Sequence, residues 1–405
     1  MFLPQNQEGA INDPASSPSR KMALLFATAC GMAVATIYFA HPLLDDMART
    51  FGITHSSVGI VITVTQLCYA FGLFLLVPLG DLLNRRRLII THMLLLVFAL
   101  IGVGYSPSRM MLFASLAAVG LLAVVTQTLV SYAASLSESQ QRGSVVGMVT
   151  SGVVIGILLA RSFAGILTDL AGWRSVYLVS AVLMLAMSGI LYLKLPRDER
   201  KKESLSYGQL LQSTLLLFTQ ERILRIRAVL AFLIFMAFSI LWTSLVLPLR
   251  AAPLSLSHFA IGAFGFAGVA GALAAARAGK LADRGLGQKT TGIALLLLLF
   301  SWWPIGMIEQ SLWGVVAGVI LLDLAVQAVH VTNQSLIFTV RPEARSRLTA
   351  SYMIFYSIGS ASGSIASTSM YAYAGWYGVC LLGAIVSAVA LIFWGVTYRE
   401  PQQTA

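Results

Sequence analysis

The stretch that decides the fold is Gly80-Asp81-Leu82-Leu83-Asn84-Arg85-Arg86-Arg87, a short polar segment between two long apolar runs. The second half of the chain repeats it as Gly279-Lys280-Leu281-Ala282-Asp283-Arg284, in which Asp283 follows Asp81 by 202 residues. Further matches share a spacing of 203 residues: Arg142 with Arg345, Gly156 with Gly359, Gly172-Trp173 with Gly375-Trp376, and Val176 with Val379. Nearly equal spacing across separate segments predicts two structural repeats, each about half of the chain.

The composition predicts that the chain lies in a lipid bilayer. Hydrophobic residues make up 58% of it and charged residues only 11%, whereas a soluble domain has roughly a quarter of its residues charged. The first 20 residues are polar and lack the apolar core of a signal peptide, so we expect a loose tail there.

The residue types also speak against a metal centre or an enzyme. Cys30, Cys68 and Cys380 lie in apolar runs without a Cys-x-x-Cys or His-Cys spacing, so neither a disulfide framework nor a metal site is expected. No nucleophile, base and orienting group recur at a recognisable spacing, and there is no phosphate-binding Gly-x-x-x-x-Gly-Lys loop. We therefore expect no enzymatic activity and no cofactor.

Twelve apolar stretches are long enough to cross about 30 Å of hydrocarbon, for which a helix needs roughly 20 residues. They are 22–44, 57–80, 87–105, 110–134, 145–169, 173–194, 225–250, 257–281, 289–308, 311–338, 347–370 and 376–398. The predicted fold is an all-α membrane protein with twelve transmembrane helices in two pseudo-symmetric six-helix bundles. The bundles cover 21–194 and 225–399, joined by a polar central loop, 195–224, and flanked by tails, 1–20 and 400–405.

The distribution of lysine and arginine predicts the orientation, because cytoplasmic loops keep the positive excess. With both termini in the cytoplasm, 21 of the 27 lysines and arginines fall on the cytoplasmic side. Four fall on the outer side, Arg49, Arg109, Arg174 and Arg250, and two, Arg161 and Arg277, lie within spans. The net charge of +11 is thus a signal of topology, and no nucleic acid partner is expected.

With this plan the chain resembles the major facilitator superfamily over nearly its whole length. That family carries a Gly-x-x-x-Asp-Arg-x-Gly-Arg-Arg pattern after its second helix and an echo of it after its eighth. The first copy here keeps Asp81, Arg85 and Arg86, with Val77, Leu82 and Asn84 at other positions of the pattern, and the second keeps Gly279, Asp283 and Arg284.

The resemblance implies a cytoplasmic latch that opens during alternating access, formed by Asp81, Arg85, Arg86, Asp283 and Arg284. Asn84 replaces a glycine of the pattern, and asparagine tolerates left-handed backbone better than most residues, so we expect the tight turn to survive. The alternative is a short charged turn that only fixes the topology.

The span 145–169 resembles the proton-antiporter branch of this family, which has the pattern Gly-x8-Gly-x3-Gly-Pro-x2-Gly-Gly there. This chain has Gly147, Gly156, Ala160, Arg161, Ala164 and Gly165 at those positions, and Gly262, Gly265, Gly268 and Gly271 on the span expected to pack against them. Small residues let helices approach closely. Arg161 replaces the proline, which removes the expected bend and places a guanidinium inside the membrane.

Asp323 is the acidic residue that falls deep within a predicted span, where a charge costs about 2.5–3.5 kcal/mol. At ~1.5 Å per residue it lies about 22 Å from the cytoplasmic end of its helix, and Arg161 lies about 24 Å from the corresponding end of its own. Asp323, Gln327, His330 and Gln334 share one helical face, which the family resemblance directs toward the central cavity. We expect Asp323, His330 and Arg161 to take part in proton coupling.

Each of these three residues also has a structural interpretation. Asp323 would lock its helix to neighbours through hydrogen bonds, His330 would be a satisfied core residue, and Arg161 would bind carbonyl groups at a packing site. The acids at the outer helix ends, Asp45, Asp46 and Asp169, are expected to be solvated.

Further candidates for a substrate cavity are aromatic and uncharged hydrogen-bonding residues on the spans that would line it. They are Tyr38, His41, Gln66, Tyr69, Gln127, Trp242, Gln327 and Gln334. This combination suits an amphipathic organic ligand. Tyr38 and Trp242 have a second interpretation as anchors at the membrane interface.

These features predict a secondary active transporter that moves a small organic solute by alternating access, with proton-coupled efflux as the expected mode. The alternatives are a proton-coupled importer or a facilitator, in which Asp323 and Arg161 bind the substrate, and a membrane sensor or scaffold without transport. The expected partners are a small-molecule substrate, protons and the lipid bilayer. We expect a monomer in a bacterial inner membrane, with both termini cytoplasmic.

Overall fold

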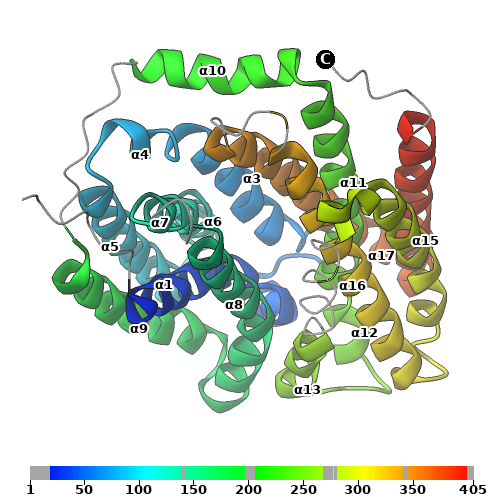
Figure 1. Ribbon diagram of the computed structural model, residues 1–405. Coiled ribbons are helices and arrows are strands. Elements are labelled where there is room, and N and C mark those ends of the chain that lie inside the picture. Colours follow the sequence, from blue (N-terminus) through cyan, green and yellow to red (C-terminus); the bar gives the residue numbers. More distant parts are fainter. Residues whose placement is uncertain are drawn as a thin grey trace, which may run out of the picture.

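The chain folds into a bundle of helices in the computed structural model, which describes residues 19–137, 142–196, 206–267, 277, 281–338, 340 and 345–398 (Figure 1). The first half contains α1 (Arg20–Tyr38), η1 (His41–Leu43), α2 (Leu44–Phe51), α3 (Ile60–Leu75), α4 (Leu79–Leu82), α5 (Arg85–Gly104), α6 (Arg109–Leu122), α7 (Val125–Ser135), α8 (Arg142–Ala171) and α9 (Trp173–Lys194). Then follow α10 (Tyr207–Gln220), α11 (Arg222–Ser244), α12 (Val246–Arg250), α13 (His258–Ala263), η2 (Phe264–Ala267), η3 (Ala282–Leu286), α15 (Gly287–Gly306), α16 (Leu312–Phe338) and α17 (Arg345–Tyr398).

Nine helical stretches within the described ranges are long and apolar enough to cross a membrane. The last, Arg347–Tyr398, holds two predicted spans, which Gly375 separates at a φ of 61°. The span predicted at 57–80 is represented by the shorter apolar helix Ile60–Leu75, and the span at 257–281 is described only in its first part, α13 and η2. The predicted class, an all-α multi-pass membrane protein, is therefore confirmed.

The helix α10 lies across one side of the molecule, where the C-terminal end of α17 also lies (Figure 1). We call this the linker side, and we call the side of α12 and α13 the opposite side. The polar segment 195–224 is not a loop throughout, as its composition predicted, because Ser206 and Gln209 form a capping box that starts a helix of 14 residues, α10. Tyr207 donates to the Leu75 carbonyl at 2.8 Å, so α10 is tied to the first half.

The two halves share local features at the repeated positions. Gly172 and Gly375 both have a positive φ, 80° and 61°, and each directly precedes the tryptophan of its repeat. A Cβ on Gly156 would stand 2.3 Å from a backbone oxygen of α1, and a Cβ on Gly359 would stand 2.2 Å from a backbone oxygen of α11. The packing of α8 on α1 therefore recurs as the packing of α17 on α11, which supports the internal repeat.

The two halves approach each other closely where small residues lie at the contact between them. A Cβ on Gly165 of α8 would stand 2.3 Å from the His258 carbonyl oxygen, so α8 and α13 are in backbone contact. Between α3 and α17, the Ser364 hydroxyl donates to the Gly59 carbonyl at 2.8 Å. These two contacts, α8 with α13 and α3 with α17, hold the first half against the second half.

The other glycines singled out in the sequence have different surroundings. Gly156 packs on α1 of its own half rather than on the second half. Gly147 has no heavy atom of the described residues within 4 Å of the place of a Cβ, so the packing role predicted for it is not seen among them. Gly268 and Gly271 lie outside the described residues.

We expect Gly165→Leu to destabilise the protein in detergent by about 1–3 kcal/mol, because the new side chain must displace the backbone of α13. Gly147→Leu is the matched control, since the same change on the same helix meets open space. Thermal unfolding of the purified variants measures the difference. Equal unfolding temperatures for the two variants would contradict a close contact between α8 and α13.

Candidate functional site

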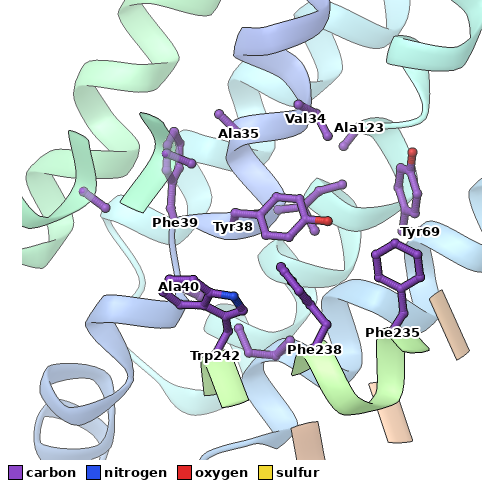
Figure 2. Close-up of a cluster of buried hydrophobic side chains, with 14 of the residues drawn as sticks. Val34, Ala35, Tyr38, Phe39, Ala40, Tyr69, Ala123, Phe235, Phe238 and Trp242 are labelled. Atoms are coloured by element: carbon purple, nitrogen blue, oxygen red, sulfur yellow. The ribbon is translucent and has the colours of Figure 1, made fainter. Parts of the chain in front are cut away.

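A buried arginine lies at the interface between the halves. Arg161 of α8 is 2% exposed, and its Cζ lies 3.6 Å from the ring centroid of Trp242 in α11. The ring centroids of Tyr38 and Phe238 lie 5.7 and 5.4 Å from the same atom, and Figure 2 shows these rings gathered between α1 and α11. Aromatic faces attract a guanidinium, most strongly the face of tryptophan. Residues of both halves therefore hold this cation.

Asp323 of α16 contacts the same tryptophan as Arg161 does. The Trp242 Nε1 donates to Asp323 Oδ1 at 3.0 Å, and Asp323 is 3% exposed. The described residues contain no direct ion pair between Asp323 and Arg161. Trp242 binds the acid through its N–H and the arginine through its ring face, so it brings the two predicted charges into one cluster.

The guanidinium of Arg161 has unused hydrogen-bond donors. Its Nε and Nη2 are buried without a hydrogen-bond partner in the part of the chain that the structure describes. Leaving such a charged donor unsatisfied costs about 1–3 kcal/mol or more. The described residues therefore do not show Arg161 bound to carbonyl groups, as its structural interpretation required. The Nε and Nη2 groups are donors that an added acceptor would satisfy.

A pair of tyrosines joins the halves next to Arg161. The hydroxyl groups of Tyr38 in α1 and Tyr356 in α17 hydrogen-bond to each other. His41 stacks on the Tyr38 ring with 5.7 Å between centroids, and its Nδ1 lies 3.2 Å from the Tyr38 carbonyl oxygen. Tyr38 and Trp242 are both buried, so neither serves as an anchor at the membrane interface.

Polar residues of α3 and α7 complete this part of the interior. Gln66 and Tyr69 are buried on α3, and the Gln127 side chain of α7 lies near the Tyr69 hydroxyl. The Oε1 of Gln66 is buried without a hydrogen-bond partner among the described residues, so it is a further group that a solute could satisfy.

The polar face of α16 continues from Asp323 toward the linker side. The His330 Nδ1 lies 3.0 Å from the Tyr352 hydroxyl, and its ring packs edge-on against Phe235 at 5.2 Å between centroids. Gln327 and Gln334 are half-buried on the same helix. His330 thus has a hydrogen-bond partner, as its structural interpretation requires, and it stays on the face that begins with Asp323.

A second buried arginine was missed by the sequence analysis, which counted Arg227 among the cytoplasmic cations. Arg227 lies inside the second half, where its Nη1 donates to Asn333 Oδ1 at 3.3 Å and to the Thr291 hydroxyl at 3.5 Å. Its neighbours in sequence, Arg222 and Arg225, made it resemble a loop cation.

The arginines of the first predicted latch bind helix ends of their own half. Arg85 donates to the Gly80 carbonyl at 2.7 Å, and Arg86 donates to the Tyr192 carbonyl at 2.6 Å. Asn84 has a φ of −62° and accepts from the Arg87 N–H as the N-cap of α5, so the expected left-handed turn at this residue is wrong. The side chains of Asp81 and Asp283 lie outside the described residues, and Arg284 is exposed. The latch stays a prediction.

The acids expected to be solvated are paired on the opposite side. Asp45 is 4% exposed, and its Oδ2 lies 3.7 Å from Arg250 Nε of α12. Asp46 and Asp169 each place a carboxylate oxygen against His258, at 2.6 and 2.8 Å. The expectation is wrong for Asp45, which is buried beside Arg250, whereas Asp46 is half-buried and Asp169 is exposed even though both contact His258. The sequence analysis did not single out His258.

Comparisons with known proteins agree with this architecture. Residues 24–338 and 228–405 match the family model described as Major Facilitator Superfamily, so the chain belongs to that superfamily. It is 46% identical over 384 residues to a protein of Escherichia coli K12 named as the transporter YgaY. The aligned region covers 95% of this chain and 97% of that protein. It is 30% identical over 399 residues to the transporter SCO4007 of Streptomyces coelicolor, covering 98% of this chain and 91% of that protein.

The fold also matches a solved structure. A bacterial homolog of the human lysosomal transporter Spinster superposes with a TM-score of 0.76 at 15% identity, covering 95% of this chain and 98% of that structure. The family and the fold are those of integral multi-pass membrane transporters, as the resemblance implied.

Proposed function

We propose that the protein is a secondary active transporter that exchanges a small organic solute for protons in the direction of efflux. The observation that carries the proposal is the cluster of Arg161, Trp242 and Asp323, which links α8 to α11 and α16 between the two halves. Buried charges where two repeats meet are typical of ion and substrate sites in secondary transporters. The resemblance of α8 to the antiporter pattern supports efflux.

The cluster offers a route by which helix movement controls a proton. With the halves together, Asp323 accepts the Trp242 N–H and lies in the same cluster as the Arg161 cation, which stabilises a carboxylate. Separation of α8 from α11 and α16 removes that cation and leaves the carboxylate buried without a counter-charge. A proton then binds, because an isolated charge is costly away from water.

Direct binding of the solute by Arg161 is the second candidate, in an importer or a facilitator. The Nε and Nη2 of Arg161, which have no hydrogen-bond partner among the described residues, favour it, because a guanidinium binds a carboxylate through two parallel hydrogen bonds. The rings of Tyr38, Phe238 and Trp242 would then pack against the apolar part of the solute.

A transport screen on reconstituted protein separates the two candidates. Uptake of a panel of metabolites and drugs into proteoliposomes is measured with and without an imposed pH gradient. The antiport proposal predicts compounds whose transport the gradient accelerates in the wild type but not in Asp323→Asn. Transport of the same compounds at equal rates with and without the gradient would favour the facilitator.

We expect the linker side to face the cytoplasm of a bacterial inner membrane, because the positive excess lies there. In a variant without native cysteines, an impermeant maleimide added to intact cells should label Pro107→Cys and miss Leu83→Cys. Both positions are exposed, one on each side, and both should react after the cells are permeabilised. The reverse pattern in intact cells would contradict the orientation.

A further inference from the structure

A histidine of the second half stands between two carboxylates of the first half on the opposite side. His258, the first residue of α13, places its Nε2 at 2.6 Å from Asp46 Oδ2 in α2 and its Nδ1 at 2.8 Å from Asp169 Oδ1 in α8. The Phe259 N–H also donates to Asp169 Oδ2 at 2.8 Å. One side chain therefore connects both halves at a place where an alternating-access transporter must open.

The geometry favours a positively charged imidazole. The His258 Nδ1 hydrogen-bonds to Asp169 Oδ1 at 2.8 Å, and the Nε2 lies 2.6 Å from Asp46 Oδ2 as an ion-pair contact without hydrogen-bond geometry among the described residues. A neutral imidazole carries a single N–H, whereas the protonated ring carries an N–H on each nitrogen and places a positive charge between the two carboxylates. The arrangement therefore suits the protonated ring.

The net charge of the cluster around His258 depends on whether the imidazole is protonated. On α2, Arg49 lies 2.9 Å from Asp45, and Arg250 of α12 lies 3.7 Å from the same carboxylate. With His258 protonated, the three cations of this cluster balance its three acids. Loss of the proton leaves one unpaired negative charge. His41 of η1, which packs near α13, is engaged with the Tyr38 carbonyl instead.

We propose that His258 is a proton-binding residue that holds the opposite side closed while protonated and lets it open after losing the proton. This inference rests on alternating access as proposed above, and it places a proton site apart from Asp323, between the ends of the halves. Protonation gives the closed state a second N–H and a positive charge between the two carboxylates, both of which the neutral ring lacks. A deprotonated His258 should raise the open-to-closed ratio roughly tenfold.

Distances between spin labels test this proposal without a known solute. Labels at Pro107→Cys and Gln310→Cys, both exposed on the opposite side and one in each half, report its opening by pulsed electron spin resonance. In the wild type, the ratio of short to long distances should fall roughly tenfold as the pH rises from about 5 to about 9, across the range in which histidine titrates.

Two substitutions should shift this equilibrium in opposite directions. His258→Gln should favour the long distance at every pH, because glutamine carries no charge, and His258→Arg should keep the short distance at every pH. His55→Gln is the matched control, since His55 is exposed on the same side and should leave the pH response intact. Size-exclusion profiles and thermal unfolding establish that each variant is folded.

The outcomes separate this inference from the proposed function. A pH response that persists in His258→Gln would overturn the role of His258 while leaving proton coupling at Asp323 intact. A response that survives in Asp323→Asn but vanishes in His258→Gln would support two separate proton sites. A distance that never changes in any variant at any pH would overturn the opening of this side, and alternating access with it.

Discussion

Asp323→Asn is expected to reduce pH-driven transport by about a hundredfold or more, because the proton acceptor is lost. Asparagine keeps an oxygen that can accept the Trp242 N–H, so the local structure should survive. Solute binding, or exchange without a gradient, should therefore persist. Initial rates in proteoliposomes with an imposed pH gradient measure the effect.

Glu309→Gln is the control for this experiment, because Glu309 is an exposed acid in the second half, on the opposite side. The rate of pH-driven transport by Glu309→Gln should match that of the wild type. Normal pH-driven transport by Asp323→Asn would show that another group carries the proton. His330, which lies on the same helix and bonds to Tyr352, would then be the next candidate.

Loss of Arg161 alone is expected to be more damaging than loss of Arg161 together with Asp323. Arg161→Met leaves the Asp323 carboxylate buried without a cation, which costs about 3–5 kcal/mol. The double variant Arg161→Met/Asp323→Leu removes both charges and should recover a large part of that stability. Unfolding of the purified variants in detergent gives the interaction free energy from a double-mutant cycle.

Trp242→Phe tests the link between these two charges. Phenylalanine keeps an aromatic face for Arg161 but removes the N–H that Asp323 accepts, so it should cost about 1–3 kcal/mol. With Trp242 present, the changes in unfolding free energy caused by Arg161→Met and Asp323→Leu should be strongly non-additive. Simple additivity would contradict any coupling between the two residues.

The sequence predicted the features that depend on local pattern. Apolar runs predicted the membrane spans, and the repeated Gly-Trp pair predicted equivalent helix starts, which Gly172 and Gly375 share in their positive φ. The sequence placed Asp323 and Arg161 at similar depths in their spans, and the structure places both in contact with Trp242, without a direct ion pair among the described residues. These properties follow from helical periodicity and from the cost of charge in lipid.

The features that the sequence did not predict depend on tertiary contacts. His258 lies 89 residues after Asp169, and nothing in its own segment shows that two carboxylates will flank it. Gly147 and Gly165 belong to the same glycine pattern, but within the part of the chain that the structure describes only Gly165 of the two meets another helix. Asn84 fits a left-handed turn by residue type, yet it caps α5 instead. Which neighbour a residue meets is fixed by packing rather than by its own segment.

Reciprocal opening of the two sides tests the proposed mechanism most directly. A second label pair, Leu83→Cys and Lys289→Cys, lies exposed on the linker side with one label in each half. As the pH is changed in reconstituted protein, the distance across the linker side should lengthen when the distance between Pro107→Cys and Gln310→Cys shortens, and the reverse. Asp323→Asn should hold the protein toward one of these states. Distances that stay constant, or that change in the same direction on both sides, would contradict proton-coupled alternating access.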